Sequence, residues 1–324
     1  MKALICDRYG PPDVLSFSDV PRPTPKEDEI LIRVNAVALN SADWRIMNGA
    51  LRFVGFGLMR PRHRILGADV AGEVVSVGRA VTDLNVGDEV YGDLSEAGFG
   101  GLAEYVVAPA RLMARKPETL TFEQAAAIPL AGATALQGAQ GRGEIRGGQR
   151  VAVYGASGGV GPYAVQIARA LGAHVTAAVR PHHRVAAQAL GADTVVDSGD
   201  FATGQPGERF DVILAVNSDR PLAVFRRALT PTGTVVVMGG AMRHIVEALA
   251  LGPLLSRPTG HKIRGLYATT TRADLDALRA LIDAGRVAPV IARTFTLDQA
   301  VDAFRCFGAG RLFGKVVVTV AEGL

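Results

Sequence analysis

A glycine-rich turn between a strand and a helix constrains the fold of this 324-residue chain more than any other feature. Residues 151–154 read as a buried strand, the turn at 155–161 has the spacing G-x-x-G-x-x-G, and Pro162 opens a helical pattern. Such a turn lets backbone N–H groups and the positive end of the helix meet a pyrophosphate. The spacing is one residue longer than G-x-G-x-x-G, so the strand-turn-helix setting carries the prediction, and a turn needed only for tight packing is the alternative. We predict a dinucleotide site that includes Ser157, Gly158, Gly159 and Val160.

The end of the next predicted strand, residues 174–179, indicates which nicotinamide cofactor binds. An NAD enzyme usually carries Asp or Glu about 20 residues after the glycines. Here Arg180 follows the strand, and residues 145–192 contain no Asp or Glu. Arg180 can grip a 2′-phosphate as a fork, and Arg184, one turn into the next helix, can add a second contact. We predict NADPH, and the alternative is that both arginines belong to a solvated helix start.

Two hydrophobic patterns divide the chain, whose length already suggests two domains. The first third has short β-branched runs separated by turn signals, which predict a small barrel, at residues 2–5, 29–37, 71–77, 87–91 and 103–107. From about Thr121, strands alternate with helices at 162–171 and 182–190, which predicts a parallel, doubly wound sheet. Its strands are expected at residues 150–154, 174–179, 194–196, 212–216 and 234–238. Ligands bind at the carboxyl ends of such strands, where we find Val216, Asn217 and Gly239.

Charge, cysteine content and hydropathy exclude several classes of protein. The formal net charge is +4 without a long run of Lys or Arg, so we expect no nucleic-acid partner. Cys6 and Cys306 are the two cysteines, which excludes a disulfide scaffold or a cysteine-rich zinc site. The uncharged stretches 125–141 and 151–168 contain prolines and glycines, so we expect buried globular segments and no membrane partner. No secretion signal is evident, and we expect a cytoplasmic protein.

Six segments taken together are highly specific, namely residues 38–43 (ALNSAD), 66–72 (LGADVAG), 86–92 (VGDEVYG), 125–129 (AAAIP), the glycine turn and 314–318 (GKVVV). On these segments the whole chain resembles the zinc-independent quinone oxidoreductase and enoyl reductase branch of the medium-chain dehydrogenase/reductase superfamily. The resemblance implies an α/β fold with two domains. A GroES-like β-barrel substrate domain is expected at residues 1–120 and 268–324, and a Rossmann NADP-binding domain at 121–267.

The resemblance also bears on metal binding and on the reaction. Zinc-dependent members of the superfamily hold a catalytic zinc with Cys, His and Cys, and the matching positions here are Asn40, Ala68 and Leu130. Ala and Leu cannot bind a metal, so we expect none. An isolated carbonyl needs a Lewis acid or a proton donor during hydride addition, whereas a quinone or an enone delocalises the new charge. The predicted activity is therefore hydride transfer from NADPH to a quinone or an α,β-unsaturated carbonyl.

Further site residues rest on the resemblance. Asn40 and Thr134 are implied to lie near the nicotinamide ribose and ring, with Asn40 in a catalytic role, and Lys315 is implied to contact the cofactor. Tyr91 is a candidate proton donor if it faces the substrate, and the alternative is a structural tyrosine. A substrate-pocket wall, or core packing instead, is expected for Trp44, Phe53 and Phe56.

Two expectations concern assembly and rival functions. The family likeness implies a homodimer joined through the edge of the Rossmann sheet, near residues 234–238 or 262–267. A function of another class is an NADPH-binding regulatory or structural protein with the same fold and little catalysis. The identity of the substrate depends on the loop at residues 50–63, whose path the sequence does not determine.

Overall fold

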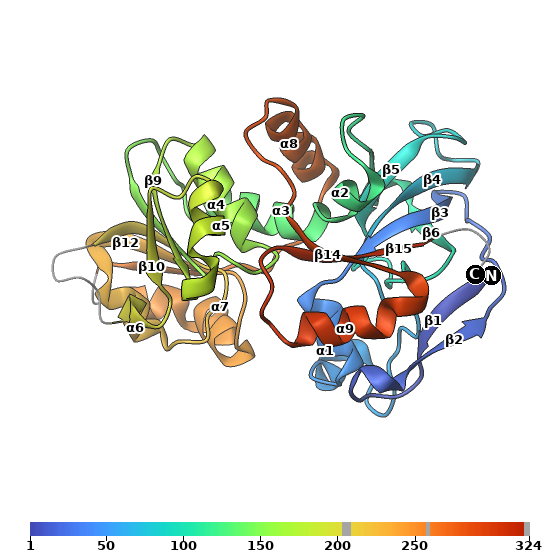
Figure 1. Cartoon of the computed structure of the whole chain (residues 1–324), viewed down its shortest axis with the longest axis horizontal. Coiled ribbons are helices and arrows are strands. Elements are labelled where there is room, and N and C mark those ends of the chain that lie inside the picture. Colours follow the sequence, from blue (N-terminus) through green and yellow to red (C-terminus); the bar gives the residue numbers. More distant parts are fainter. Residues whose placement is uncertain (203–208, 257–259, 321–324) are drawn as a thin grey trace. The chain divides into compact units, whose positions relative to one another are not determined.

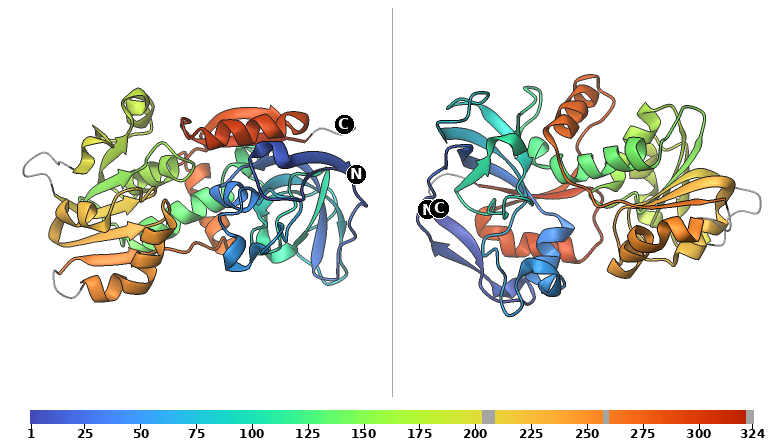
Figure 2. Two further views of the ribbon diagram at one scale, coloured as in Figure 1. Left: turned by 90° about the horizontal axis from the view of Figure 1, so that it is seen from below. Right: turned by 180° about the vertical axis from the view of Figure 1, so that it is seen from behind.

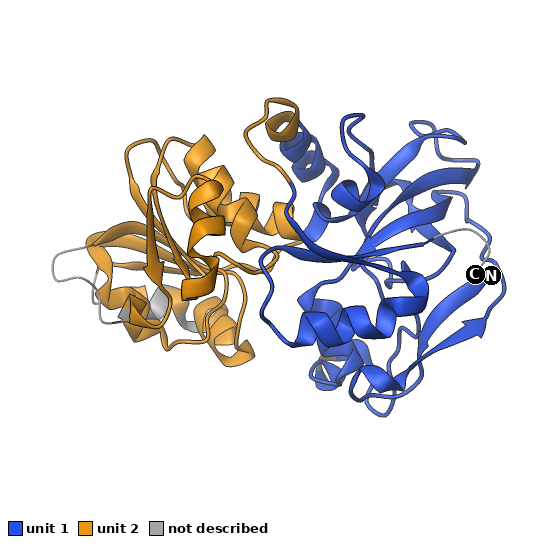
Figure 3. Cartoon of the chain, viewed as in Figure 1, with its two compact units in different colours: residues 1–130, 270–279, 289–324 blue, residues 131–269, 280–288 orange. Residues whose placement is uncertain are grey.

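The structure, a computed structural model, describes residues 1–202, 209–256 and 260–320. The chain divides into two units, coloured separately in Figure 3. Unit 1 comprises Met1–Leu130, Thr270–Arg279 and Pro289–Leu324, and unit 2 comprises Ala131–Thr269 and Ala280–Ala288. The domain limits expected from the sequence, with breaks after residues 120 and 267, differ slightly from these divisions and remain a prediction.

Unit 1 is built mainly from strands. They are β1 (Lys2–Cys6), β2 (Leu15–Asp19), β3 (Glu29–Ala38), β4 (Asp69–Val77), β5 (Glu89–Asp93), β6 (Tyr105–Pro109), β7 (Met113–Arg115), β14 (Ile291–Thr296) and β15 (Lys315–Thr319). The helical segments are η1 (Pro12–Val14), α1 (Ser41–Met47), η2 (Arg52–Phe56), η3 (Ala110–Leu112), α2 (Phe122–Ala126), η7 (Leu297–Gln299) and α9 (Ala300–Gly308). Two further helices, α3 (Pro129–Leu136) and α8 (Arg272–Asp283), begin in unit 1 and end in unit 2.

The sheet of unit 1 is mixed and encloses an apolar core. Its order is β14-β15-β3-β4-β5-β7, with β6 paired to β3, while β1 and β2 pair separately (Figure 1). The amphipathic helix α9 buries Phe304 in this core together with Val34 and Val90 of the sheet. The strand expected at 87–91 begins later, at Glu89, because Gly87 has φ +92° and lies in the preceding turn.

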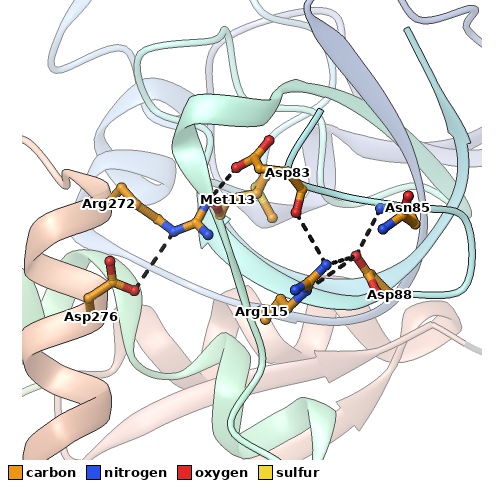
Figure 4. A network of polar contacts seen from close by, with 7 residues as sticks. All are labelled: Asp83, Asn85, Asp88, Met113, Arg115, Arg272 and Asp276. Atoms are coloured by element: carbon orange, nitrogen blue, oxygen red, sulfur yellow. Dashed lines mark hydrogen bonds and ion pairs between the residues drawn. The ribbon is translucent and has the colours of Figure 1, made fainter. Parts of the chain in front are cut away.

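Polar contacts hold the start of α8 against the barrel of unit 1 (Figure 4). Arg272 donates to the carbonyl of Met113 at 2.5 Å and lies 3.4 Å from Asp83. Nearby, Arg115 donates to Asp88 at 2.8 Å and to the carbonyl of Asp83. These charged groups are partly exposed, so each ion pair contributes little to stability and mainly fixes where the helix begins.

Unit 2 alternates strands and helices, as the sequence predicts. Its strands are β8 (Arg150–Tyr154), β9 (His174–Val179), β10 (Thr194–Asp197), β11 (Phe210–Ala215), β12 (Leu229–Val237) and β13 (Lys262–Gly265). Its helical segments are η4 (Gln137–Arg142), α4 (Gly161–Ala170), η5 (Pro181–His183), α5 (Arg184–Ala189), η6 (Asp200–Ala202), α6 (Leu222–Arg227) and α7 (Met242–Ser256). The strands predicted at 150–154 and 174–179 are confirmed, whereas the helix predicted from residue 182 begins as an α-helix at Arg184, after a turn opened by Pro181.

The sheet of unit 2 is parallel and doubly wound. Its order is β10-β9-β8-β11-β12-β13, so the chain moves outward from β8 in one direction and then from β11 in the other. Because parallel crossovers are right-handed, this reversal places α4 and α5 on one face and α6 and α7 on the other (Figure 2). The switch point lies between β8 and β11, where Tyr154 pairs with Ala215. Ligands of such sheets bind beyond the carboxyl ends at this point.

Glycines end two of these helices. Gly172 and Gly191 follow α4 and α5 with φ +81° and +96°, a conformation that costs glycine no Cβ clash. In the part of the chain that the structure describes, no helix is both long enough and apolar enough to cross a membrane.

Candidate dinucleotide site and buried polar cluster

Two glycines of the turn after β8 are required by the fold itself. Gly155 has φ +84°, and a Cβ there would lie 2.8 Å from the Cβ of Asn217. A Cβ on Gly161 would lie 2.4 Å from the carbonyl carbon of Ala156. The first glycine lets the chain turn beside β11, and the second lets α4 begin directly against the turn.

Gly158 differs, because the protein leaves open space around it. A Cβ there would meet only the carbonyl oxygen of Gly155, at 3.8 Å, and the residue is exposed. The absence of a side chain is therefore not needed for packing. Together with the start of α4, this open position suits the close approach of a pyrophosphate to backbone N–H groups. Ser157, Gly159 and Val160 flank it and are half-buried.

The structure places Val216, Asn217 and Gly239 beyond the carboxyl ends of the strands, where the glycine turn also lies. The N–H groups of Val216 and Asn217 point to the carbonyl of Tyr154, at 3.0 and 3.3 Å. Ser218, fully buried, donates through N–H and Oγ to the carbonyl of Gly239. Sequence reasoning missed this role for Ser218, because the bond joins residues 21 positions apart.

A buried histidine supports the same loop. Nδ1 of His244 on α7 lies 2.7 Å from the carbonyl oxygen of Ser218, and its ring is 5% exposed. Because the short side-chain bond fixes one ring nitrogen, the ring holds the loop after β11 against the start of α7. No sequence motif marks His244.

The two arginines predicted to bind the 2′-phosphate follow β9, Arg180 directly and Arg184 at the start of α5. Arg180 is exposed and directly follows the strand, two residues after Ala178, whose carbonyl accepts from Gly155 at 3.2 Å. Arg184 is also exposed, but its Nη1 donates to the carbonyl of Val195 at 3.0 Å. The end of β9 and the glycine turn therefore lie side by side at the carboxyl ends of the strands. One donor of the Arg184 guanidinium is already hydrogen-bonded to β10.

A second polar arrangement lies in the interior of unit 1. Lys315, at the start of β15, donates to Oδ1 of Asn40 at 2.5 Å and to Oδ2 of Asp69 at 3.1 Å. The side chains of Lys315 and Asp69 are 2% and 0% exposed. Oδ1 of Asp69 accepts the N–H of Leu130 at 3.0 Å. Both Lys315 and Asp69 are thus held inside the unit by partners from distant parts of the chain.

Asp43 completes this buried polar cluster, which consists of Asn40, Asp43, Asp69 and Lys315. Its two carboxylate oxygens accept the N–H groups of Asn40, at 2.9 Å, and of Gly67, at 2.8 Å. This geometry fixes the loop before α1 and gives Asp43 a structural role.

Burial shifts the pKa values of both carboxyl groups upward. Burial raises the pKa of Asp43 from 3.8 to about 7, although its two N–H donors act in the opposite direction. Burial also raises the pKa of Asp69 to about 6, and the ammonium of Lys315 is the largest opposing influence. The cluster therefore titrates at a pH where exposed carboxyl groups are already ionised.

The three positions that match zinc ligands converge around Asp69. Asn40 reaches it through Lys315, Ala68 precedes it in the chain, and Leu130 donates its N–H to it. The positive charge beside the carboxyl group of Asp69 is the ammonium of Lys315. Within residues 1–202, 209–256 and 260–320, no group of three or more His, Cys, Asp or Glu side chains is placed to hold a metal ion.

The remaining predicted residues have different surroundings. Tyr91 is fully buried and donates to the carbonyl of Leu275 at 3.1 Å, which favours the structural role over proton donation. Thr134 lies in α3 and is buried. Trp44 packs on the core beside Phe307. Phe56 stacks edge-on against Phe99 and His63, whereas Phe53 is 72% exposed.

Comparisons with known proteins find similar proteins over nearly the whole length of the chain. Residues 26–118 match the family model of the alcohol dehydrogenase GroES-like domain, and residues 190–318 match a model described as zinc-binding dehydrogenase. The chain is 33% identical to a chloroplast envelope quinone oxidoreductase homolog of Arabidopsis thaliana over 98% of both proteins. It is 34% identical to an NADPH-dependent alkenal/one oxidoreductase of the same plant, covering 98% of this chain and 79% of the relative. A solved quinone oxidoreductase from Coxiella burnetii superposes with a TM-score of 0.86 at 29% identity, over 99% of both chains.

Proposed function

The chain belongs to the quinone oxidoreductase and enoyl reductase-like branch of the medium-chain dehydrogenase/reductase superfamily, and we propose that it transfers hydride from NADPH to a quinone or an α,β-unsaturated carbonyl. The observation that carries this proposal is the open position at Gly158, at the switch point of the sheet and next to the strand β9, which Arg180 directly follows. The substrate class of the two plant relatives supports the same chemistry.

The residues at this edge fit a phosphorylated dinucleotide. Backbone N–H groups from Ser157 to Val160 and the start of α4 would bind the pyrophosphate, and Arg180 would grip the 2′-phosphate. Val216, Asn217 and Gly239 would contact the nicotinamide half, and Thr134 would lie near its ring. When bound, NADPH supplies the hydride.

In unit 1, we assign Asn40 to the nicotinamide ribose and Lys315 to positioning Asn40. The amide of Asn40 cannot turn freely, because its oxygen accepts from the Lys315 ammonium and its Nδ2 donates to the carbonyl of Ala38 at 3.3 Å. Lys315 itself is 3% exposed, so it acts through Asn40 rather than by reaching a ligand.

The proposed reaction proceeds without zinc. Ala68 and Leu130 stand where ligands would be needed, and a buried ammonium next to Asp69 disfavours a second cation there. A conjugated acceptor needs less help than an isolated carbonyl, because its own π-system spreads the developing charge. Orientation of the two reactants then supplies most of the rate enhancement.

Steady-state assays with NADPH and a panel of quinones and enones test the proposal directly. We expect turnover of at least one class, unchanged after dialysis against a chelator. Absence of turnover with every acceptor would contradict it. Tight NADPH binding without hydride transfer would support the rival function, a binding protein of the same fold with little catalysis.

We further propose a homodimer joined at β13, the edge strand of the unit 2 sheet. An edge strand offers unpaired N–H and C=O groups, and Met242, Val246 and Leu249 on the adjacent helix α7 are each about half exposed. Tyr267, just beyond β13, is 78% exposed. Light scattering at micromolar concentration should give twice the mass of the 33.9 kDa chain, and a monomer would exclude this interface. A cytoplasmic location remains a prediction.

A further inference from the structure

One loop of unit 1 presents large apolar side chains to solvent although the chain anchors it firmly. We call residues 50–64, which follow α1, the arginine loop. Phe53 is 72% exposed, Leu58 66% and Met59 91%. Leu58 and Met59 are consecutive in sequence, and large apolar side chains exposed together on one loop are typical of a surface that binds something else.

The base of the arginine loop is tied down, so the exposure of its tip is a built feature. The hydroxyl of Tyr9 shares its one hydrogen between two carbonyl oxygens, that of Phe56 at 3.0 Å and that of Gly57 at 2.5 Å. The N–H of Arg62 closes the loop on the carbonyl of Phe56 at 2.8 Å. Phe56 itself turns inward against Phe99, while Phe53, Leu58 and Met59 turn outward.

The charge of the arginine loop has one sign. Its residues 50–64 contain four arginines and no Asp or Glu. Arg64 pairs with Asp7, through bonds of 2.5 and 2.9 Å, but among the described residues Arg52, Arg60 and Arg62 form no ion pair. All three are exposed, and Arg52 lies over the ring of Phe53 at 4.6 Å.

We propose that the arginine loop binds the interface of an anionic lipid membrane, with Leu58, Met59 and Phe53 in the headgroup region and the arginines on the phosphates. Interfacial binding combines a small buried apolar area with basic side chains around it, which is the composition found here. A single strand of nucleic acid fits less well, because Leu58 and Met59 offer no flat face on which a base could stack.

This inference revises the expectation that the chain has no membrane partner, which rested on the lack of a spanning segment. The arginine loop is too short to span a bilayer, but lying in an interface requires no span. The inference does not depend on the proposed reaction, because it concerns a surface of unit 1 and not the cofactor.

Sedimentation of the full chain with vesicles at low salt tests the inference. We expect binding to vesicles of mixed phosphatidylcholine and phosphatidylglycerol, and little binding to phosphatidylcholine alone. The double variant Leu58→Ser/Met59→Ser should bind at least tenfold more weakly. Arg60→Ser/Arg62→Ser should lose about fivefold in affinity per arginine and respond less to added salt.

Val86→Ser is the matched control, because Val86 is 63% exposed in the same unit but stands between Asp83 and Asp88. This variant should bind vesicles as the wild type does, and thermal melting should show that all variants are folded. Equal binding of the wild type and the Leu58→Ser/Met59→Ser variant would overturn the proposal. So would failure of the wild type to bind anionic vesicles, or capture of an RNA oligonucleotide in their place.

Discussion

The buried polar cluster of unit 1 and the glycine turn of unit 2 differ in burial and in the space that they leave for a ligand. In the cluster, Asn40, Asp43, Asp69 and Lys315 satisfy one another and nearby N–H groups, and every one of them is at least nine-tenths buried. At the turn, Gly158 is exposed and a side chain there would meet almost nothing. The cluster is complete without a ligand, whereas the turn leaves room for one.

This difference separates two kinds of functional residue. Residues of the cluster affect function only through the position of Asn40. Substitution of any one of them should lower the stability of unit 1 strongly. Residues of the turn act on a ligand and cost the fold little, with the exception of Gly155 and Gly161. Stability and binding measurements on the same variants should therefore separate the two regions.

Lys315→Met should have the largest effect on stability. It leaves the carboxyl group of Asp69, 0% exposed, without its cation, and breaking a buried ion pair costs about 3–5 kcal/mol. Urea unfolding followed by Trp44 fluorescence measures this loss, because Trp44 is the only tryptophan and lies in unit 1.

The second change Asp69→Asn serves as the control for this variant. It removes the unpaired charge but keeps an oxygen for the N–H of Leu130, so the double variant should regain more than half of the lost stability. If the double variant is as unstable as the single one, Lys315 stabilises the unit by packing rather than by its charge.

The cluster should also make unit 1 less stable as pH rises from 4 to 7. The pKa values of Asp43 and Asp69 are raised to about 7 and about 6 from 3.8, so the folded chain binds more protons than the unfolded chain in this range. The associated stability is complete below about pH 3.8 and is lost as pH passes the folded values, an effect on the order of 4 kcal/mol for Asp43 and about 3 kcal/mol for Asp69.

The comparison with Asp43→Asn isolates this dependence from other titrating groups. Burial lowers the pKa values of His63 and His261, which gives the opposite slope below pH 6.5, but both histidines are present in the two proteins. The free energies of unfolding of the wild type and the variant should therefore diverge between pH 4 and 7. A difference that is constant over this range would mean that Asp43 titrates at its ordinary pKa.

Two alanine substitutions in the turn should separate folding from binding. In Gly161→Ala the new Cβ meets the backbone of Ala156 at 2.4 Å, so we expect a loss of about 2–3 kcal/mol in stability. In Gly158→Ala the nearest atom is 3.8 Å away, so stability should change by less than about 0.5 kcal/mol. NADPH affinity of Gly158→Ala should nevertheless fall about tenfold or more, because the methyl group takes the space of the pyrophosphate. Titration followed by NADPH fluorescence measures this affinity. An affinity of Gly158→Ala equal to that of the wild type would mean that the pyrophosphate binds elsewhere.

The turn could be predicted from sequence because its signal is local, whereas the cluster could not. A strand, seven residues and a helix suffice to locate Gly155–Gly161, and the strand ending at Val179 locates Arg180. Asn40 and Lys315 are 275 positions apart, and nothing in either segment shows that one side chain holds the other. The same limit hid the contact of Ser218 with His244 and the burial of Tyr91, which depend on how the strands pair.

Arg180→Asp should shift cofactor preference from NADPH toward NADH. The change removes a charge-assisted hydrogen bond to the 2′-phosphate, which contributes roughly 1.5–3 kcal/mol, or about ten- to hundredfold in affinity, and it installs an acceptor for a ribose hydroxyl. Kd values for both cofactors at fixed salt measure the ratio. Arg146→Asp is the matched control, because Arg146 is also exposed and lies in the same acid-free stretch. Arg146 precedes β8, so it lies at the amino ends of the strands, away from the predicted cofactor site. An unchanged ratio in Arg180→Asp would remove Arg180 from the site.

Arg184→Ala should have the smallest effect, a loss of about two- to fivefold in NADPH affinity with no change for NADH. Its guanidinium is exposed and already donates to the carbonyl of Val195 at 3.0 Å, so only its remaining donors can turn toward a phosphate. Kd measurements at low and high salt should show the loss shrinking as salt rises, since a contact made mainly through charge is screened. Arg184→Lys, which keeps the charge but not the fork, should recover most of the affinity. If Arg184→Ala weakens NADPH as much as Arg180→Asp does, the 2′-phosphate is held over the start of α5 and not at the end of β9.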